Sequence, residues 1–273
     1  MIKLLPQPKV SVWNEENFCL NYQARIVLET EEQSSFLYAK MLQSEVKKAT
    51  GMKLAVLRGK ARTYDICLCT QQGCMGEDAS SLKREQGYQL MVTEEQVIVR
   101  AETKEGMFYG VQTLRQIIRQ KGAMIPYCRI EDWPDYRDRG FYHDVTRGRV
   151  ATLDTLKDMV DHLCLYKMNQ FQLYIEHTYL FRDFSELWRD DTPLTAEEIM
   201  ELDSYCRERN IDLVPSLASF GHLYKLLRTK HFEGLCELEE SRKDPFSFRG
   251  RMLHHTLNAA DKRSMELSKK MIE

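Results

Sequence analysis

The order of predicted elements in the second half of the chain constrains the fold most. Short apolar segments at residues 140–145, 171–176 and 211–217 have the composition of strands. The segments between them, 152–167 and 195–210, carry apolar residues at helical spacing. A strand, helix, strand, helix, strand order predicts parallel strands joined by right-handed crossovers. This half of the chain is therefore predicted to be α/β.

Two architectures share this order of elements, the nucleotide-binding open sheet and the barrel. No glycine-rich phosphate loop follows any of the three strand segments, which argues against the nucleotide-binding type. A complete (β/α)8 TIM barrel needs about 250 residues. Residues 131–273 are therefore predicted to be the first half of a (β/α)8 barrel, a truncated domain.

The first 130 residues alternate strand-like and helix-like segments in a less regular way. Residues 30–33 have the composition of a capping box ahead of a helix, and residues 105–120 form a second amphipathic segment. Such a mixture predicts a small α+β N-terminal domain, a sheet with helices on one face. The proline-containing segment 129–136 is the predicted junction between the domains 1–130 and 131–273.

The overall composition excludes several classes of function. The 273 residues carry a net charge of −2, so nothing in the totals attracts nucleic acid or an anionic membrane. No apolar run approaches the roughly 20 residues that span a bilayer, and the first ten residues are too weakly apolar for a signal peptide. The eight cysteines lack zinc spacing. They are predicted to be reduced thiols in a cytoplasmic protein.

Unusual polar residues follow each of the three predicted strands. In a parallel barrel the chemistry gathers at the carboxyl ends of the strands. These positions hold, in chain order, Asp144 and Arg147, then Glu176 and His177, then Ser219, Gly221 and His222. The sequence therefore predicts that these side chains meet at one edge of the sheet.

Each of these positions also has a purely structural interpretation. Arg139 and Asp144 bracket a strand and suit either an ion pair or the binding of sugar hydroxyls, since guanidinium groups donate and carboxylates accept. Glu176 ends a buried strand, where a carboxylate needs either an opening or a partner. Gly221 permits a tight turn, and His222 either lines the site or caps the next helix.

Aromatic residues offer a further candidate contact with a sugar. Trp188 follows the second strand, on the expected face of the site, and is a better stacking platform than Trp133. Both tryptophans also fit ordinary packing. No third ligand accompanies any pair of histidines, so neither a metal nor another cofactor is predicted.

Several motifs together resemble a known family. Residues 139–147 (RGFYHDVTR) resemble the first barrel strand of glycoside hydrolase family 20, the β-N-acetylhexosaminidases, with its R-G-x-x-x-D-x-S/T-R pattern. Residues 165–169 (LYKMN) are similar to its L-Y-K-x-N, and 219–222 (SFGH) to its P-G-H after the third strand. Residues 109–116 resemble the last helix of the family's N-terminal domain.

The resemblance implies a glycosidase that releases terminal β-linked N-acetylhexosamine, with the sugar's own acetamido group as nucleophile. It implies that Arg139 binds hydroxyls of the terminal sugar and that His222 lines the pocket. Arg139, Glu176 and His222 are therefore expected to converge at one edge of the parallel sheet and to hold the acetamido sugar. The family has two aspartates where this chain has Glu176 and His177. Its catalytic Asp-Glu pair follows the fourth strand and is expected beyond residue 273, so no catalytic residue is assigned and the chain alone is expected to be inactive.

Two alternatives remain open at this point. One is a non-catalytic protein that binds saccharides, or an inactive fragment of such a hydrolase. The other is a barrel hydrolase for a different class of sugar. The expected partner is an oligosaccharide or glycoconjugate with a terminal N-acetylhexosamine, and the open edges of a half barrel favour self-association.

Overall fold

The computed structural model describes residues 2–188, 192–238, 247 and 255–272. The chain divides into two compact units. The first comprises residues up to Arg139, together with 161–169 and 208–211, and the second comprises the remainder. Strand β7 (Met124–Asp132) runs through the predicted boundary at residue 130, and the units divide between Arg139 and Gly140.

The first unit is built on a mixed seven-stranded sheet with the order β1-β7-β5-β6-β4-β2-β3. Strands β3, β2, β4 and β6 run parallel, whereas β5, β7 and β1 pair antiparallel with their neighbours. The other strands are β1 (Val10–Cys19), β2 (Arg25–Glu29), β3 (Ala55–Arg58), β4 (Ile66–Thr70), β5 (Tyr88–Val92) and β6 (Val97–Ala101). The predicted α+β character of this region is confirmed.

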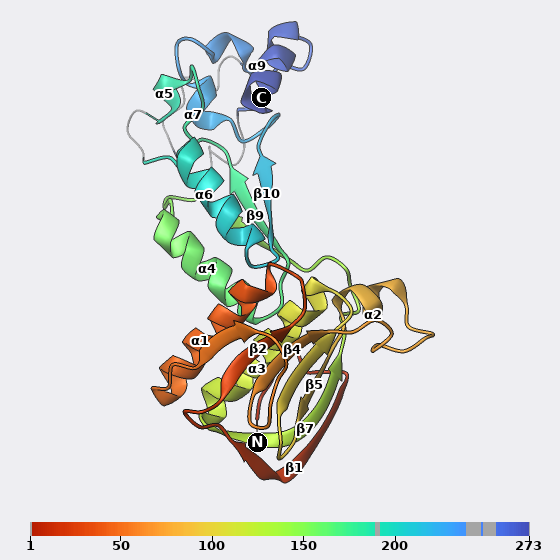
Figure 1. The fold of residues 1–273 in the computed structure, drawn as a ribbon. Coiled ribbons are helices and arrows are strands. Elements are labelled where there is room, and N and C mark those ends of the chain that lie inside the picture. Colours follow the sequence, from red (N-terminus) through yellow and green to blue (C-terminus); the bar gives the residue numbers. More distant parts are fainter. Residues whose placement is uncertain (1, 189–191, 239–246, 248–254, 273) are drawn as a thin grey trace. The chain divides into compact units, whose positions relative to one another are not determined.

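Two helices, α1 (Ser35–Thr50) and α3 (Lys104–Lys121), lie side by side in this unit (Figure 1). An ion-pair cluster joins the two helices: Glu45 of α1, which is 3% exposed, pairs with both Arg115 and Arg119 of α3. The shorter helix α2 spans Ser81–Gln86. The helices bury apolar side chains because these recur at helical spacing.

The predicted capping box at residues 30–33 is wrong. Helix α1 begins only at Ser35, and its N-cap Ser34 makes no side-chain capping bond. Thr30 instead accepts a hydrogen bond from the backbone N–H of Glu32 through Oγ1, at 3.2 Å. A hydroxyl that closes such a local turn competes with helix initiation, and here the turn follows directly on β2.

The second unit contains a three-stranded parallel sheet with the order β10-β9-β8. Its strands are β8 (Gly140–Asp144), β9 (Gln170–Ile175) and β10 (Asp212–Leu217). Helix α4 (Leu153–Leu165) connects the first two strands and α6 (Ala196–Arg207) the last two. The predicted parallel α/β rhythm is therefore confirmed, and it is consistent with the start of a barrel.

A capping box does begin helix α6. Glu198 N donates to Thr195 Oγ1 at 3.2 Å, and Thr195 N donates to Glu198 Oε2 at 2.9 Å. The reciprocal pair satisfies two backbone donors at the helix start. Shorter elements complete the unit, namely α5 (Ser185–Trp188), α7 (Tyr224–Leu227), η1 (Glu233–Leu235) and the longer α9 (Lys262–Ile272).

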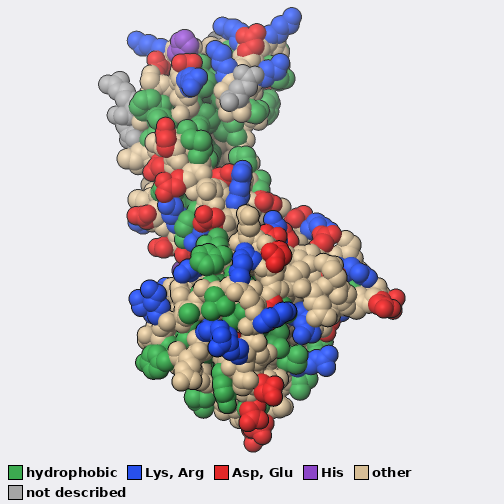
Figure 2. All heavy atoms as spheres, viewed as in Figure 1, with side chains coloured by type: hydrophobic (Ala, Val, Ile, Leu, Met, Phe, Trp, Pro, Cys, Tyr) green, Lys and Arg blue, Asp and Glu red, His purple; other side chains and the backbone are tan. Residues whose placement is uncertain are grey.

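Acidic and basic side chains are interspersed on the face shown in Figure 2. Among the described residues, no helix is long and apolar enough to cross a bilayer.

Candidate functional site

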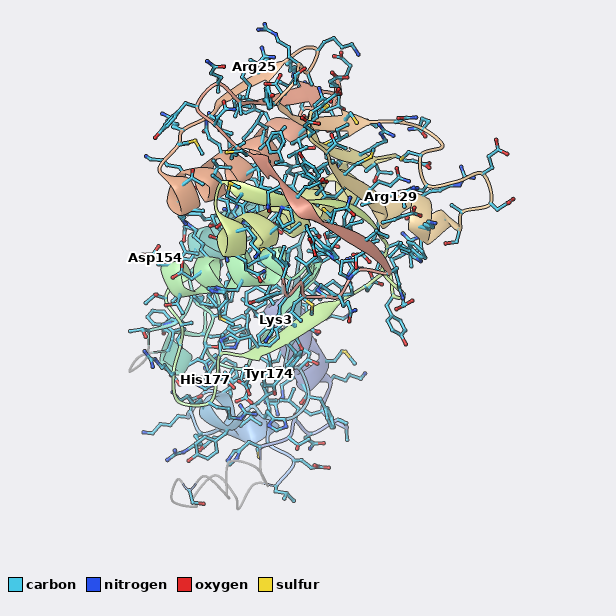
Figure 3. The ribbon with its side chains drawn as sticks, turned by 90° about the horizontal axis from the view of Figure 1, so that it is seen from below. Lys3, Arg25, Arg129, Asp154, Tyr174 and His177 are labelled. Carbon is cyan, nitrogen blue, oxygen red and sulfur yellow. The ribbon has the colours of Figure 1, made fainter. Side chains whose placement is uncertain are left out.

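The carboxyl ends of β8 and β9 bring polar residues together in the second unit. Asp144, the last residue of β8, lies opposite Tyr174 in β9. Because the two strands run parallel, Arg147 and Glu176 follow them at the same edge of the sheet. Figure 3 labels Tyr174 and His177, which flank Glu176 in this segment.

Glu176 is the centre of this cluster and is only 3% exposed. Its Oε1 accepts hydrogen bonds from Arg147 Nη1 at 2.6 Å and from the Tyr174 hydroxyl at 3.1 Å. His222 Nδ1 lies 3.6 Å from the same oxygen, and His177 Nδ1 lies 3.9 Å from Oε2. The buried carboxylate is therefore matched to a cation, as burial of a charge requires.

The electrostatic coupling changes the proton affinity of both donors. Burial works against the charged form of Arg147, but the hydrogen bond and charge of Glu176 outweigh it and raise the pKa of Arg147. Burial, followed by the negative charge of Glu176, raises the pKa of Tyr174 to about 12. Tyr174 therefore stays neutral and keeps its proton for donation.

The turn after β8 fixes the other side of the cluster. Asp144 Oδ1 accepts hydrogen bonds from the backbone N–H and the hydroxyl of Thr146, at 2.8 and 2.7 Å. Arg147 Nη1 donates to the same hydroxyl, and Arg147 Nε lies 3.6 Å from Asp144 Oδ2. The Asp144 and Arg147 side chains remain about one third exposed, at 33% and 30%, so both can reach a ligand.

His222 occupies an unusual backbone conformation. Its φ is +60°, in the left-handed region that non-glycine residues seldom adopt. The expected special turn residue was Gly221, but the positive φ falls on the histidine. The N-cap of α7 is Leu223, so the interpretation of His222 as a helix cap is wrong. Strained residues gather at functional sites, and this one holds its ring edge-to-face with Tyr174, with centroids 6.4 Å apart.

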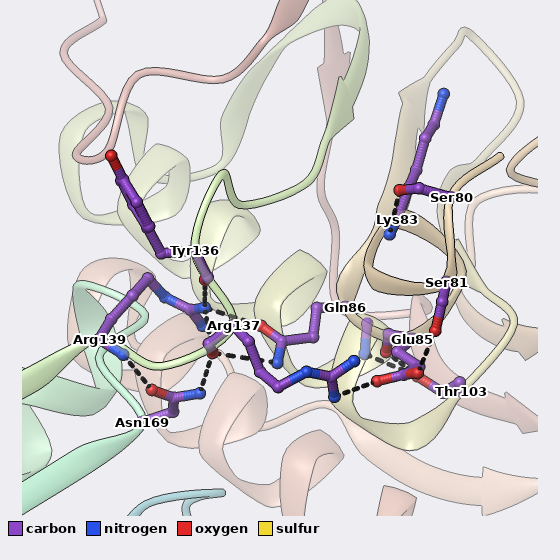
Figure 4. A network of polar contacts seen from close by, with 11 residues as sticks. Ser80, Ser81, Lys83, Glu85, Gln86, Thr103, Tyr136, Arg137, Arg139 and Asn169 are labelled. Carbon is purple, nitrogen blue, oxygen red and sulfur yellow. Dashed lines mark hydrogen bonds and ion pairs between the residues drawn. The ribbon is translucent and has the colours of Figure 1, made fainter.

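The prediction that Arg139 converges with Glu176 and His222 is wrong. Arg139 precedes β8 and so lies at the amino end of that strand, opposite to the end that carries Asp144. Its guanidinium donates to the carbonyl oxygens of Tyr136 and Arg137 and to Gln86 Oε1 (Figure 4). It also donates to the carbonyl oxygen of Lys167. The reason is topological, since a residue one place before a strand cannot reach the edge beyond its last residue.

The remaining predicted residues have less defined roles. His177 is 6% exposed and contributes through its contact with Glu176. Trp188 ends α5, and its indole N–H is buried without an acceptor among the described residues. Its role as a stacking platform stays a prediction. No group of three or more metal-binding side chains occurs in the described part of the chain.

Sequence reasoning gave too little weight to two residues of this cluster. The strand-end pattern places Arg147 at this edge but does not pair it with Glu176, and it does not mark Tyr174 as part of the site. The available signal was register, because Tyr174 and Glu176 alternate in β9 and must share one face of the sheet. A basic residue beside a buried carboxylate was the second signal.

Comparison with known proteins identifies the first region. Residues 1–133 match glycosyl hydrolase family 20, domain 2. Residues 1–133 therefore correspond to domain 2 of this family, and similarity to β-hexosaminidases extends into the second unit. A β-hexosaminidase of Porphyromonas gingivalis is 22% identical over 246 residues, covering 81% of this chain and 30% of that protein. A β-hexosaminidase of Akkermansia muciniphila is 31% identical over 156 residues, covering 50% of this chain and 31% of that protein.

Solved family 20 structures share the fold over almost the whole chain. The β-N-acetylhexosaminidase of Streptomyces coelicolor superposes with a TM-score of 0.79 at 21% identity, covering 98% of this chain and 56% of that one. A β-hexosaminidase of Streptomyces plicatus in complex with GlcNAc gives 0.79 at 20% identity, over 98% and 55%. The chain therefore spans about half the length of these solved structures and about a third of the length of the curated relatives that it matches.

Proposed function

We propose that the Glu176 cluster binds a terminal N-acetylhexosamine residue, and that the chain contributes this binding surface to a β-N-acetylhexosaminidase. The proposal rests on the family relationship and on one observation, the buried ion pair of Glu176 with Arg147 beside the exposed ring of His222. Relatives of this fold have been solved with N-acetylglucosamine bound.

Some side chains of the cluster are exposed and others are buried, and this difference suggests their roles in binding. Asp144, Arg147 and His222 are the accessible members, with side chains 33%, 30% and 43% exposed. They offer an acceptor, a planar donor and an imidazole, which suit the hydroxyl groups of one sugar ring. Glu176 lies behind them and accepts from Arg147. In this proposal it is a positioning residue that holds the donors in place.

The chemistry of the complete enzyme needs further groups. In substrate-assisted hydrolysis the acetamido oxygen attacks the anomeric carbon and the glycosidic oxygen leaves with a proton from a general acid. Glu176 accepts hydrogen bonds from Arg147 and Tyr174. Asp144, the other carboxylate of the cluster, accepts from the backbone N–H and hydroxyl of Thr146. Both carboxylates are therefore engaged as acceptors. We propose that the acid and the acetamide-orienting carboxylate come from the rest of the catalytic region, and that this chain alone does not turn over substrate.

Two measurements on the 273-residue chain test the proposal together. Titration with N-acetylglucosamine, followed by the shift of backbone NMR signals in residues 144–147 and 174–177, should saturate in the millimolar range typical of single sugars, roughly 1–10 mM. Hydrolysis of a chromogenic N-acetylglucosaminide should stay at the uncatalysed rate. Absence of saturable binding would refute the sugar site. Clear hydrolysis would refute the proposal that the catalytic carboxyl groups come from the rest of the catalytic region.

The rival function is saccharide binding without hydrolysis in any form of the protein. The engagement of Glu176 as an acceptor favours it, because binding requires only the donors and acceptors already present. A protein that includes the rest of the family 20 catalytic region separates the two. Hydrolysis by that longer protein supports the enzyme, whereas binding without hydrolysis supports the rival.

A further inference from the structure

A pocket lined by charged and aromatic side chains lies entirely within the first unit and has no part in the site described above. Its volume is about 440 Å³, within the usual range for small-ligand sites. The side chains that carry the argument are Lys9, Trp133, Asp135, Tyr136, Arg139 and Lys167. None of them belongs to the Glu176 cluster.

One wall of the pocket is a buried ion pair. Lys167 is 6% exposed, and its Nζ lies 2.8 Å from both Asp132 Oδ2 and the Tyr88 hydroxyl. The Tyr88 hydroxyl also contacts Thr113 Oγ1 at 2.6 Å. Burial lowers the pKa of Lys167 against the opposing pull of Asp132. Lys167 also adopts a φ of +61°, in the left-handed region that non-glycine residues seldom adopt.

The charges that line the pocket do not cancel. Lys167 pairs with Asp132, and Lys9 Nζ lies 2.6 Å from Asp135. Within the described part of the chain, the Arg139 guanidinium donates hydrogen bonds to three carbonyl oxygens and to the amide oxygen of Gln86, which are all neutral. Three cations therefore face two carboxylates, which leaves one positive charge for a ligand to neutralise.

Flat apolar surfaces complete the lining. Tyr136 is 75% exposed, and Trp133 is half-buried with Lys83 Nζ 4.0 Å from its ring centroid. Arg139 stacks on Tyr109, with 5.1 Å between the guanidinium carbon and the ring centroid. Aromatic faces combined with directed donors and acceptors recognise a ring that is apolar on its faces and polar at its edge. A pyranose has that character.

We propose that this pocket is a second carbohydrate site, which binds a saccharide unit bearing one carboxylate, such as a uronic acid. The carboxylate neutralises the charge of Arg139, and the sugar ring lies against Tyr136 and Trp133. Hydroxyl groups complete the hydrogen bonding with Lys9 and Asp135 at the rim. The site does not depend on the function proposed for the Glu176 cluster.

The Trp133 indole N–H signal of the ¹⁵N-labelled 273-residue chain provides the readout, assigned through its loss in Trp133→Phe. Sodium glucuronate should shift this signal saturably, with half-saturation at about 1–20 mM. Glucose at the same concentrations should bind at least fivefold more weakly. Raised salt should weaken glucuronate binding, because the exposed charge is screened. A glucuronate titration without saturation, or an equal response to glucose, would overturn the proposal.

Matched variants locate the binding. Tyr136→Ala should raise the half-saturation concentration about fivefold through lost ring contact, without disturbing the backbone carbonyl that Arg139 uses. Tyr22→Ala is the control, because Tyr22 is 82% exposed and does not line the pocket. Arg139→Gln should abolish the preference for glucuronate, with folding checked by thermal unfolding. Unchanged binding in Tyr136→Ala would contradict the assignment even if Arg139→Gln fails to fold.

Discussion

Arg147 Nη1 lies 2.6 Å from Glu176 Oε1, across 29 positions of sequence. The bond ties the turn after β8 to the end of β9, and its carboxylate is almost completely buried. A buried ion pair contributes little net stability, but removal of one partner leaves the other charge without compensation. The pair therefore fixes the geometry of the cluster more than it stabilises the fold.

Removal of the Glu176 charge should weaken sugar binding, although in the proposal Glu176 does not itself contact the sugar. Glu176→Gln keeps the shape of the side chain but replaces a charge-assisted bond to Arg147 with a neutral one, which costs about 1–2 kcal/mol. We expect the half-saturation concentration for N-acetylglucosamine to rise about tenfold. Glu186→Gln on the exposed face of α5 is the control. Equal binding by the two variants would show that Glu176 does not position the cluster.

Acid should destabilise the first unit through Asp65. Burial by itself would raise the pKa of Asp65, but hydrogen bonds from Arg25 and from Arg62 N–H outweigh it and lower that pKa below its ordinary 3.8. The unfolded state then binds the proton more readily, so the stabilisation is present above pH 3.8 and disappears as the pH falls through the folded pKa. Melting temperatures at pH 2.5–6 should fall toward acid.

The matched variant for this acid effect is Asp65→Asn. It should be less stable than the wild type at pH 6, because Arg25 loses its charged partner. The difference between the two proteins should shrink as the pH falls below about 4. A constant difference across the whole range would assign the acid sensitivity to other carboxylates.

The capping box of α6 should be measurable as stability of the second unit. Thr195→Ala removes the hydroxyl that accepts from Glu198 N, and loss of an N-cap costs about 1 kcal/mol. Urea unfolding should show that decrease, while Thr195→Ser should retain most of the stability because its hydroxyl can accept the same bond. If Thr195→Ala left the free energy of unfolding unchanged, packing alone would stabilise the start of the helix.

Open strand edges should make the chain associate with itself. In the described sheet of the second unit, β8 and β10 each pair on one side only. A pocket lined by Leu213, Pro215, Met271 and other apolar residues lies beside β10. We expect sedimentation velocity to show dimers or larger species as concentration rises, since such edges invite pairing.

A charged substitution on the edge strand β10 tests whether this edge mediates the association. Leu213→Lys should shift the distribution toward monomer, because a lysine on an edge strand discourages pairing. Met265→Lys should not, since Met265 is 63% exposed on α9 and outside the pocket lining. A wild-type chain that stays monomeric at every concentration would contradict the prediction.

Local sequence patterns predicted the helices and strands of the second unit well, because apolar residues recur there at the spacing of each element. The order β8, α4, β9, α6, β10 followed from apolar spacing, and Thr195 with Glu198 marked the start of α6 correctly. The similar pattern at Thr30 failed, because the Thr30 hydroxyl closes a turn with Glu32 instead. Both segments have the composition of a capping box, so the structure around each segment determines whether the capping box forms.

Hydrophobic periodicity and turn residues act over a few positions, so the parallel order of strands and the polar residues at the strand ends were predictable from the amino-acid sequence. Which of those polar residues meet depends on how the strands assemble into the sheet. Arg147 joined Glu176, whereas Arg139 turned to Lys167 and Gln86 at the opposite end of β8. Ion pairing between distant segments depends on strand direction and register, and these are fixed only when the sheet assembles.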